Sequence, residues 1–309
     1  MKHIANVITD LIGNTPLLRL TRFAEAKGLT TAPLAKLEYF NPAGSVKDRT
    51  ALSMIQKAEA QGLLKPGYTI IEPTSGNTGV GLAFICSTRG YKLILTMPET
   101  MSMERQKLLK AYGASLILTP GSEGMAGAIQ KANELCQTMD NALILQQFNN
   151  PSNPEVHYHT TAEEIWRDTA GEIDAFVACV GTGGTLTGTA RRLKEWNPNI
   201  YTVAVEPATS AVLSGKDKGA HKIQGIGAGF IPSIYDGSVV DEVITVTDEE
   251  AIQHSQLLAT YEGVLAGFSS GAALAAASKL LQRNGSVWKH VIVLLPDNGE
   301  RYLSTNLFG

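Results

Sequence analysis

The sequence predicts an α/β protein of two doubly wound domains, in which helices cover both faces of mainly parallel sheets. Short apolar runs rich in β-branched residues alternate with segments of helical periodicity along nearly the whole chain. This alternation is typical of consecutive strand–helix–strand units, which place successive strands parallel. The chain has 309 residues, 44% of them hydrophobic, which is enough for two domains of ordinary size with their own cores.

The expected strands are short runs bounded by glycine, proline or polar residues. An early strand-like segment, Leu17–Leu20 with Leu34–Glu38, precedes the alternating part of the chain. The strands that follow are expected at Tyr68–Glu72, Lys92–Met97, Ser115–Leu118, Leu143–Gln147, Ala175–Val180, Thr202–Val205, Glu242–Val246 and His290–Leu295.

The expected helices lie between these strands, and each carries apolar residues three or four positions apart. They include Gly79–Arg89, Met103–Tyr112, Gly124–Gln137, Glu155–Thr169, Thr185–Trp196, Glu249–Glu262 and Gly271–Gln282. Ligands of such folds bind where strands end and helices begin, so the loops that follow strands are the places to search for a site.

A domain boundary is expected near residues 149–154. Two prolines and three asparagines fall in this short segment, and both residue types interrupt helices and strands.

Composition excludes several classes of function. The formal net charge is −3 and no block of like charges is present, so no nucleic acid or anionic membrane is expected as a partner. The three cysteines (Cys86, Cys136 and Cys179) are widely spaced, which argues against a disulfide framework or a zinc site. No signal peptide or membrane-spanning run is evident, so we expect a cytoplasmic protein that holds no metal.

The run Asn41–Arg49 places Lys47 just after a turn of small residues, at the start of a helix with apolar periodicity. Backbone amides at a helix start disfavour an ammonium group, and burial adds to that effect. Both favour the neutral amine, which is the nucleophile that forms an imine with an aldehyde. On this segment alone an ordinary surface lysine is the better interpretation, and the later motifs reverse that preference.

Pro73–Gly79 offers hydroxyls, backbone amides and an asparagine amide between a strand and a helix. A helix start of this kind is a good receptor for a carboxylate. Capping of the helix needs only one such side chain, so four consecutive small polar residues favour binding.

Gly181–Thr185 follows another expected strand and opens a helix. Its glycines allow several N–H groups to converge on phosphate oxygens, and its threonines add donors. The loop lacks the Lys-Ser/Thr of a P-loop and the GxGxxG fingerprint of dinucleotide sites, which favours a small phosphate monoester.

Gly267–Ala273 is a similar small-residue turn before a helix, and alone it indicates no more than a capped helix that packs closely. A lysine, a phosphate cradle and a carboxylate cradle together match pyridoxal phosphate, whose aldehyde, phosphate and amino-acid substrates need these three groups.

Four motifs resemble those of the β-family (fold type II) of pyridoxal-phosphate enzymes, and within it the cysteine synthases, A-type O-acetylserine sulfhydrylases. The motifs are Ser45–Arg49, Thr74–Asn77, Gly181–Thr185 and Phe268–Gly271. Four more stretches are similar to the family, in the same order along nearly the whole chain: Glu99–Lys107, Gln146–Phe148, His221–Pro232 and Glu300–Thr305.

The resemblance implies a tryptophan synthase β-like fold and a homodimer. The smaller N-terminal domain would span residues 44–150 and include a mobile subdomain at about residues 90–135. The larger, cofactor-binding domain would combine residues 1–43 with 151–309.

The resemblance also implies roles for individual residues. Lys47 would form the imine with pyridoxal phosphate and act as the catalytic base, Asn77 would bind the ring oxygen and Ser269 would face the pyridine nitrogen. The phosphate would be held by Gly181, Thr182, Gly183, Gly184 and Thr185. The substrate would be bound by Thr74, Ser75, Gly76, Thr78, Gln147 and Gly225.

The activity implied by the resemblance is a β-replacement that makes L-cysteine from O-acetyl-L-serine and sulfide through an α-aminoacrylate. A cystathionine β-synthase-like condensation of serine or O-acetylserine with homocysteine is an alternative. A second alternative is regulatory binding of the C-terminal tail of serine acetyltransferase, for which the carboxylate cradle is suited.

The chain departs from the family pattern at a few positions. Asp297 follows Pro296 where serine is more usual, and we expect it to be displaced from the pyridine nitrogen, with Ser269 as the partner. Thr50 replaces a usual apolar residue, and Ala220 a usual proline. Cys179 precedes the phosphate loop and is expected to be a buried strand cysteine.

Overall fold

The computed structural model describes residues 4–284 and 287–309, and the chain divides into two compact units. Unit 1 combines the described residues up to Ile12 with Asn41–Asn153, and unit 2 combines Gly13–Phe40 with Pro154–Gly309. The passage from unit 1 to unit 2 at Asn153 falls within the asparagine- and proline-rich segment.

The N-terminal segment differs from the predicted grouping, which placed residues 1–43 with the larger domain. In the structure the short 3-10 helix η1 (Ile8–Leu11) contacts helix α3 (Asn77–Arg89) of unit 1, and Ile12 packs against the core of that unit. Apolar packing therefore assigns residues 4–12 to the smaller unit, while residues 1–3 lie outside the described residues.

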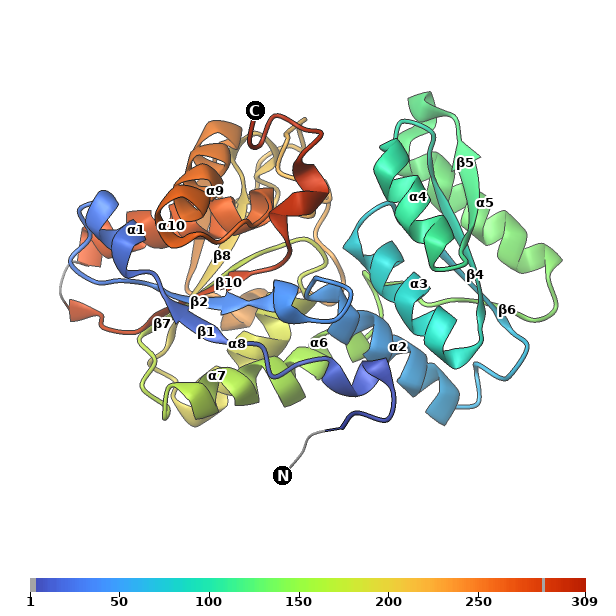
Figure 1. The fold of residues 1–309 in the computed structure, drawn as a ribbon, viewed down its shortest axis with the longest axis horizontal. Helices are drawn as coiled ribbons and strands as arrows, with labels where there is room; N and C mark the ends of the chain where they lie inside the picture. Colours follow the sequence, from blue (N-terminus) through green and yellow to red (C-terminus); the bar gives the residue numbers. More distant parts are fainter. Residues whose placement is uncertain (1–3, 285–286) are drawn as a thin grey trace. The chain divides into compact units, whose positions relative to one another are not determined.

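Unit 1 contains a four-stranded parallel sheet with the order β5-β4-β3-β6 (Figure 1). The pairing of β3 with β6 ends at Ile71 opposite Ile144. The strands are β3 (Thr69–Pro73), β4 (Lys92–Pro98), β5 (Ser115–Thr119) and β6 (Ala142–Ile144).

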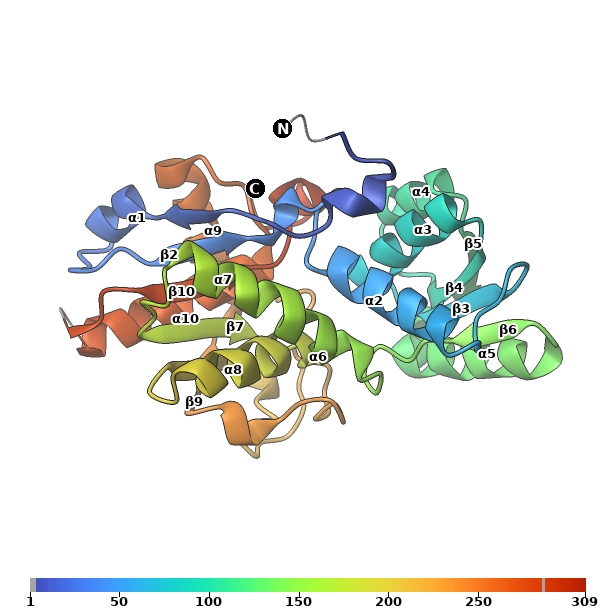
Figure 2. The same ribbon diagram turned by 90° about the horizontal axis from the view of Figure 1, so that it is seen from below.

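The helices that lie between consecutive strands of unit 1 form crossovers, as consecutive parallel strands require, whereas α2 precedes the first strand of the sheet. Helix α2 packs against α3, and α5 packs against the strands (Figures 1 and 2). The helices are α2 (Lys47–Ala60), α3 (Asn77–Arg89), α4 (Met103–Ala111) and α5 (Gly124–Thr138). A short helix, α6 (Ser152–Val156), lies where the chain passes from unit 1 to unit 2.

Unit 2 contains a six-stranded sheet with the order β1-β2-β10-β7-β8-β9, parallel except for the β1–β2 pair. Strand β10 lies inside the sheet, and each of its residues is buried, so it consists of a continuous apolar run. The strands are β1 (Leu17–Arg19), β2 (Leu34–Leu37), β7 (Ala175–Cys179), β8 (Tyr201–Pro207), β9 (Glu242–Val246) and β10 (Val291–Leu295).

Helices cover both faces of the unit 2 sheet. Helices α9 and α10 pack together on one face, and α7 and α8 lie on the other (Figures 1 and 2). The helices are α1 (Thr21–Ala26), α7 (Ala162–Asp168), α8 (Gly184–Trp196), α9 (Asp248–Glu262) and α10 (Phe268–Asn284).

The expected single helix Glu155–Thr169 is divided in the structure. Helix α6 leads into a π-helical turn, η4 (His157–Thr161), and α7 begins only after it. A π-helical turn inserts a residue into the helical ladder and is frequent at functional sites.

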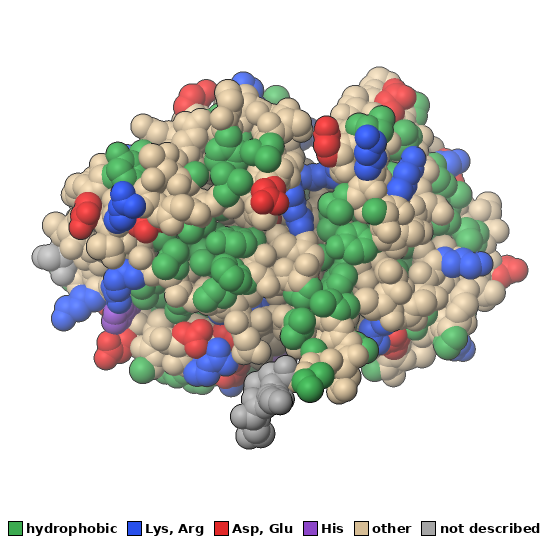
Figure 3. Space-filling model, viewed as in Figure 1, with side chains coloured by type: hydrophobic (Ala, Val, Ile, Leu, Met, Phe, Trp, Pro, Cys, Tyr) green, Lys and Arg blue, Asp and Glu red, His purple; other side chains and the backbone are tan. Residues whose placement is uncertain are grey.

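On the face drawn in Figure 3, basic and acidic side chains are interspersed, in agreement with the small net charge. Among the described residues, no helix combines the length and apolar character needed to cross a lipid bilayer.

Candidate active site

Lys47 is the first residue of α2 and follows a tight turn at Gly44, whose φ of +79° is a left-handed conformation that favours glycine. The carboxylate of Asp48 closes the turn by accepting a hydrogen bond from the Ala43 N–H at 2.6 Å. Lys47 itself is half-buried, although the sequence analysis favoured burial. The turn therefore holds the lysine at a defined helix start with partial access to solvent.

The segment Thr74–Thr78 leads from β3 into α3. Gly76 is the N-cap of α3, and no side chain caps this helix. By contrast, Ser102 caps α4 and Thr247 caps α9 through their hydroxyl groups. The threonines, serine and asparagine of the segment therefore do not serve as the N-cap, which favours binding of a ligand at this helix start.

Two of the predicted substrate-binding residues meet in unit 1. The hydroxyl of Thr78 donates a hydrogen bond to Oε1 of Gln147 at 2.5 Å, and both side chains are buried. The contact joins residues that are 69 positions apart and brings the loop after β6 to the start of α3.

Close helix packing also connects Lys47 with α3. A Cβ added at Gly81 would lie 2.8 Å from the carbonyl oxygen of Lys47, so only glycine allows this approach of α2 and α3. Lys47, Thr74–Thr78 and Gln147 are thus linked through contacts within one unit.

The predicted phosphate loop lies in unit 2, between β7 and α8. Gly183 is the N-cap of α8 with a φ of +84°, so the N-cap residue itself offers no side-chain acceptor, and the hydroxyl of Thr182 accepts the N–H of Gly184 at 3.4 Å. The other N–H groups of the first turn have no partner inside the helix, which suits this helix start to an anionic ligand.

The glycines of this loop are required by its packing. A Cβ at Gly181 would clash with the carbonyl oxygen of Gly225, and one at Gly183 would lie 2.9 Å from the Cβ of Tyr235. The structure therefore brings Gly225, a predicted substrate contact, beside the phosphate loop.

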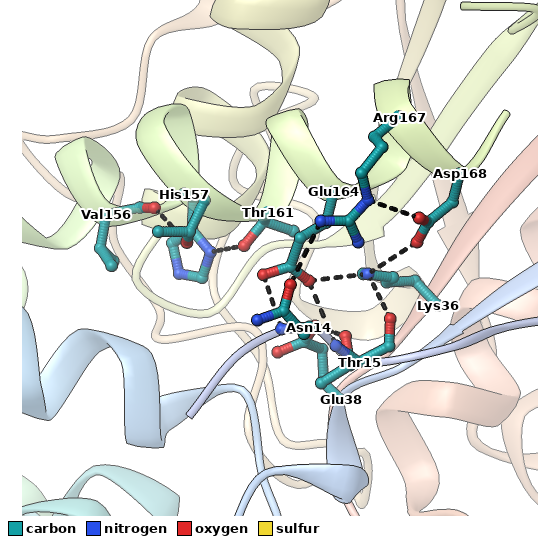
Figure 4. A network of polar contacts seen from close by, with 11 residues as sticks. Asn14, Thr15, Lys36, Glu38, Val156, His157, Thr161, Glu164, Arg167 and Asp168 are labelled. Carbon is teal, nitrogen blue, oxygen red and sulfur yellow. Dashed lines mark hydrogen bonds and ion pairs between the residues drawn. The ribbon is translucent and has the colours of Figure 1, made fainter. Parts of the chain in front are cut away.

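His157 is a residue of this site that the sequence analysis missed. It is fully buried in η4, and its Nε2 lies 3.2 Å from Oγ1 of Thr185 at the start of α8. The other ring nitrogen, Nδ1, lies 2.9 Å from Oγ1 of Thr161 (Figure 4). No local motif marks this histidine, because the contact depends on how α8 packs against the π-helical turn.

Ser269 lies in the first turn of α10, which begins at Phe268 rather than at the expected Gly271. Its backbone carbonyl accepts a hydrogen bond from the thiol of Cys179 at 3.2 Å. Cys179 ends β7, so this contact ties the start of α10 to the strand that leads into the phosphate loop. Burial raises the pKa of the Cys179 thiol well above its usual range, which makes it an unreactive packing group.

The carboxylate of Asp297 accepts a hydrogen bond from the hydroxyl of Tyr302, and it packs against Gly267, where a Cβ would clash with its Oδ1. The role of Ser269 as partner of the pyridine nitrogen stays a prediction.

A family model described as pyridoxal-phosphate dependent enzyme matches residues 8–297. The chain belongs to this family. Cysteine synthase A of Escherichia coli strain K12 is 54% identical over 306 residues, which cover 96% of this chain and 93% of that protein.

Solved structures agree with the family. Cysteine synthase from Entamoeba histolytica matches with a TM-score of 0.96 and 46% identity, over 99% of this chain and 91% of that chain. An O-acetylserine dependent cystathionine beta-synthase from Helicobacter pylori matches with a TM-score of 0.93 and 41% identity, over 100% of both chains. The family, the fold class and the cofactor predicted from the sequence are confirmed.

Pyridoxal phosphate, the cofactor of this family, fits the groups present in each unit. Unit 2 offers the start of α8, where the backbone amides and threonine hydroxyls of Gly181–Thr185 are suited to a phosphate. Unit 1 offers a partly exposed lysine at the start of α2, accessible to an aldehyde.

A second lysine, Lys36, is fully buried but has a structural role (Figure 4). Its Nζ lies 2.8 Å from a carboxylate oxygen of Glu164 and donates to the carbonyl of Thr15 at 2.5 Å. Glu164 also accepts the N–H groups of Asn14 and Thr15, at 2.8 and 3.3 Å. This network ties the start of unit 2 to α7, so burial alone does not identify the cofactor-binding lysine.

Proposed function

We propose that this protein is a cysteine synthase, which makes L-cysteine and acetate from O-acetyl-L-serine and sulfide with pyridoxal phosphate. The observation that carries the proposal is a shared feature of the two predicted binding loops. The helices that follow them, α3 and α8, both have a glycine as the N-cap residue, so each presents backbone amides at a helix start that lies next to threonine hydroxyls. The similarity to cysteine synthase A along nearly the whole chain supports this reading.

We assign the binding of pyridoxal phosphate to the residues predicted from the sequence. The amides and hydroxyls of Gly181–Thr185 bind the phosphate, with the hydroxyl of Thr185 oriented by His157. Asn77 binds the ring oxygen and Ser269 the pyridine nitrogen. When bound, pyridoxal phosphate supplies an aldehyde that combines with amines and a ring that delocalises negative charge developing at Cα.

The substrate carboxylate is assigned to unit 1. The start of α3 offers the hydroxyls of Thr74 and Ser75 and the backbone amides of Gly76 and Thr78 in a region of positive helix dipole. Because Oε1 of Gln147 accepts the Thr78 hydroxyl, its Nε2 group is left to donate to a carboxylate. Gly225 leaves space beside the amino acid.

Lys47 transfers the proton of the substrate Cα. Its neutral Nζ removes the proton from Cα of O-acetylserine while acetate leaves Cβ. After sulfide has added to Cβ, Lys47 returns a proton to Cα and cysteine departs. Ser269 presents a neutral hydroxyl, so it does not force a proton onto the pyridine nitrogen, which suits the loss of a good leaving group.

The test is product formation by the purified holoenzyme with O-acetylserine and either sulfide or homocysteine. We expect cysteine as the preferred product, and we expect Lys47→Ala to abolish turnover. Because a cystathionine beta-synthase from Helicobacter pylori matches the whole chain, the homocysteine reaction is the second candidate. A higher kcat/KM with homocysteine than with sulfide would replace the proposed function with that one.

Three further predictions accompany this function. The protein is a homodimer in the cytoplasm, consistent with its three free cysteines. The segment at about residues 90–135 closes on substrate. The start of α3 captures the C-terminal carboxylate of serine acetyltransferase, and titration with a peptide of that tail measures this binding separately from catalysis.

A further inference from the structure

We propose that Glu72, a residue outside the predicted site, is a positioning residue. It holds Gln147 in the orientation that binds the substrate carboxylate. The inference rests on the proposed role of Gln147 in binding the substrate carboxylate. The buried carboxylate of Glu72 touches neither substrate nor cofactor in the proposed site. It acts only through the loop after β6, residues 145–147.

Glu72 lies on β3, and 1% of its surface is exposed. Its Oε2 accepts the N–H groups of Leu145 and Gln146, and its Oε1 accepts the N–H of Gln147, each at 3.1 Å. One side chain therefore holds three successive backbone amides, the last of which belongs to the predicted substrate-binding residue.

These amides lie at the point where the sheet stops pairing. Strand β6 is an edge strand whose ladder with β3 ends at Ile144, so residues 145–147 have no further partner in that ladder. The carboxylate of Glu72 supplies the missing acceptors. Leu145 and Gln147 are buried, so loss of this carboxylate would leave their amides without an acceptor, and the loop depends on it.

The loop is also strained. Gln146 has a φ of +58°, a left-handed conformation that is unfavourable for a non-glycine residue. Such a residue persists where its surroundings over-determine it. Here the Glu72 carboxylate fixes its N–H, and its carbonyl accepts the N–H groups of Asn149 and Asn150 at 2.9 Å.

Gln147 is consequently held at three points. Its N–H is bound by Glu72, its carbonyl accepts a hydrogen bond from the Asn153 side chain at 2.9 Å, and its Oε1 accepts the Thr78 hydroxyl. Loss of the hydrogen bond to Glu72 would let the backbone of Gln147 rotate. Its side-chain amide would then no longer face a substrate carboxylate at the start of α3.

A carboxylate is chemically suited to this task. It accepts hydrogen bonds at both oxygens and donates none when ionised, so it can receive three N–H groups at once. An amide of the same shape would turn an NH₂ group toward at least one of these donors. Glu72→Gln is therefore a nearly isosteric change that removes the function.

The experiment compares the wild-type holoenzyme with Glu72→Gln and Glu72→Asp above pH 7, where the Glu72 carboxyl is ionised although burial raises its pKa to about 7. We expect Glu72→Gln to raise the KM for O-acetylserine about tenfold, the effect of one misplaced hydrogen bond to a charged group, with kcat almost unchanged. Glu72→Asp keeps the charge on a shorter side chain, so its KM for O-acetylserine should lie between that of the wild type and that of Glu72→Gln. Ile85→Val, a buried change on α3 at a residue outside the predicted site, is the control that should lower stability without changing KM.

A double-mutant cycle with Gln147→Ala tests whether Glu72 acts through Gln147. We expect Glu72→Gln to add little to the KM of the Gln147→Ala variant, while the losses of thermal stability add. If the KM of the double variant rises by the product of the two single-variant factors, the inference is overturned. If Gln147→Ala alone leaves KM unchanged, the assigned role of Gln147 fails and the inference fails with it. If only the Glu72 variants leave KM unchanged, the inference alone is lost.

Hydrogen exchange on the cofactor-free protein gives a readout that does not depend on activity or on the variants folding. In the wild type we expect the amides of Leu145–Gln147 to be protected as strongly as those of β3. In Glu72→Gln they should exchange at least about tenfold faster. Rapid exchange of these amides in the wild type would show that Glu72 does not hold the loop and would overturn the inference.

Discussion

Nε2 of His157 lies 3.2 Å from Oγ1 of Thr185, a contact that joins the π-helical turn η4 to the start of α8. The ring is fixed from its other side by Thr161, and the imidazole is fully buried. Since the ring cannot rotate freely, the Thr185 hydroxyl has one preferred orientation. The first turn of α8 therefore carries a hydroxyl group of fixed position next to its backbone amides.

Replacing His157 should weaken cofactor binding. In His157→Asn the Thr185 hydroxyl loses its partner, and we expect the dissociation constant for pyridoxal phosphate to rise about fivefold to tenfold. Titration of the cofactor-free protein with pyridoxal phosphate, followed by absorbance, measures this. His159→Asn changes an exposed histidine of the same turn and is the matched control. Equal affinities in the two variants would contradict the assigned role of His157.

Replacing Lys36 should lower stability and leave the chemistry intact. Lys36→Met leaves Glu164 buried without its ion-pair partner, which costs about 3–5 kcal/mol in the free energy of unfolding. Arg191→Met, which breaks the exposed pair with Asp236, should cost less than about 1 kcal/mol. Urea unfolding of both variants checks the contrast, and similar losses would mean that the Lys36 network contributes little.

The free energy of unfolding should depend on pH through Glu72. Burial raises the pKa of Glu72 from its ordinary value of 4.5 to about 7, although the three amide donors act in the opposite direction. Between these values the folded chain retains a proton that the unfolded chain has released. The contribution of Glu72 is therefore favourable at the acidic end and is lost as pH rises from about 4.5 to about 7.

Glu72→Gln removes this pH dependence. The difference in free energy of unfolding between wild type and variant should change by at most about 1.4 kcal/mol per pH unit in that window and be constant outside it. Urea unfolding of the cofactor-free proteins across the range provides the measurement. Parallel curves throughout would mean that the carboxyl titrates at its ordinary pKa in the folded protein.

Gly181 should not tolerate a side chain. In Gly181→Ala the new Cβ meets the carbonyl of Gly225, so either the loop or residue 225 must move. We expect at least about a tenfold loss of pyridoxal phosphate affinity together with a lower Tm. Gly237→Ala, where a Cβ meets only an ordinary contact 3.6 Å from Tyr235, should retain both properties. Unchanged cofactor affinity in Gly181→Ala would argue against phosphate binding by this loop.

Much of the fold could be predicted because its signals are local. The strands of the parallel sheets are short apolar runs, such as β10, and β3, β4, β7 and β9 are each followed by a helix with its own periodicity. The loops at Thr74–Thr78 and Gly181–Thr185 could be found for the same reason, since a small-residue segment between a strand and a helix is visible in the sequence alone.

The supporting residues could not be predicted, because their roles depend on contacts distant in sequence. Glu72 is 75 positions from Gln147, and its neighbours suggest only the end of a strand. The π-helical turn at His157–Thr161 interrupts a segment whose periodicity predicts one helix. Thr50, a departure from the family pattern, gains a partner only in the fold, where its hydroxyl donates to the Asn153 side chain at 3.3 Å.

The most direct test of the account is to locate the bond between cofactor and protein. The purified holoenzyme is reduced with borohydride, digested, and its peptides are analysed by mass spectrometry. The account predicts a pyridoxyl group on Nζ of Lys47 and a visible absorbance band that is lost on reduction. A pyridoxyl group on another lysine, or on none, would contradict it.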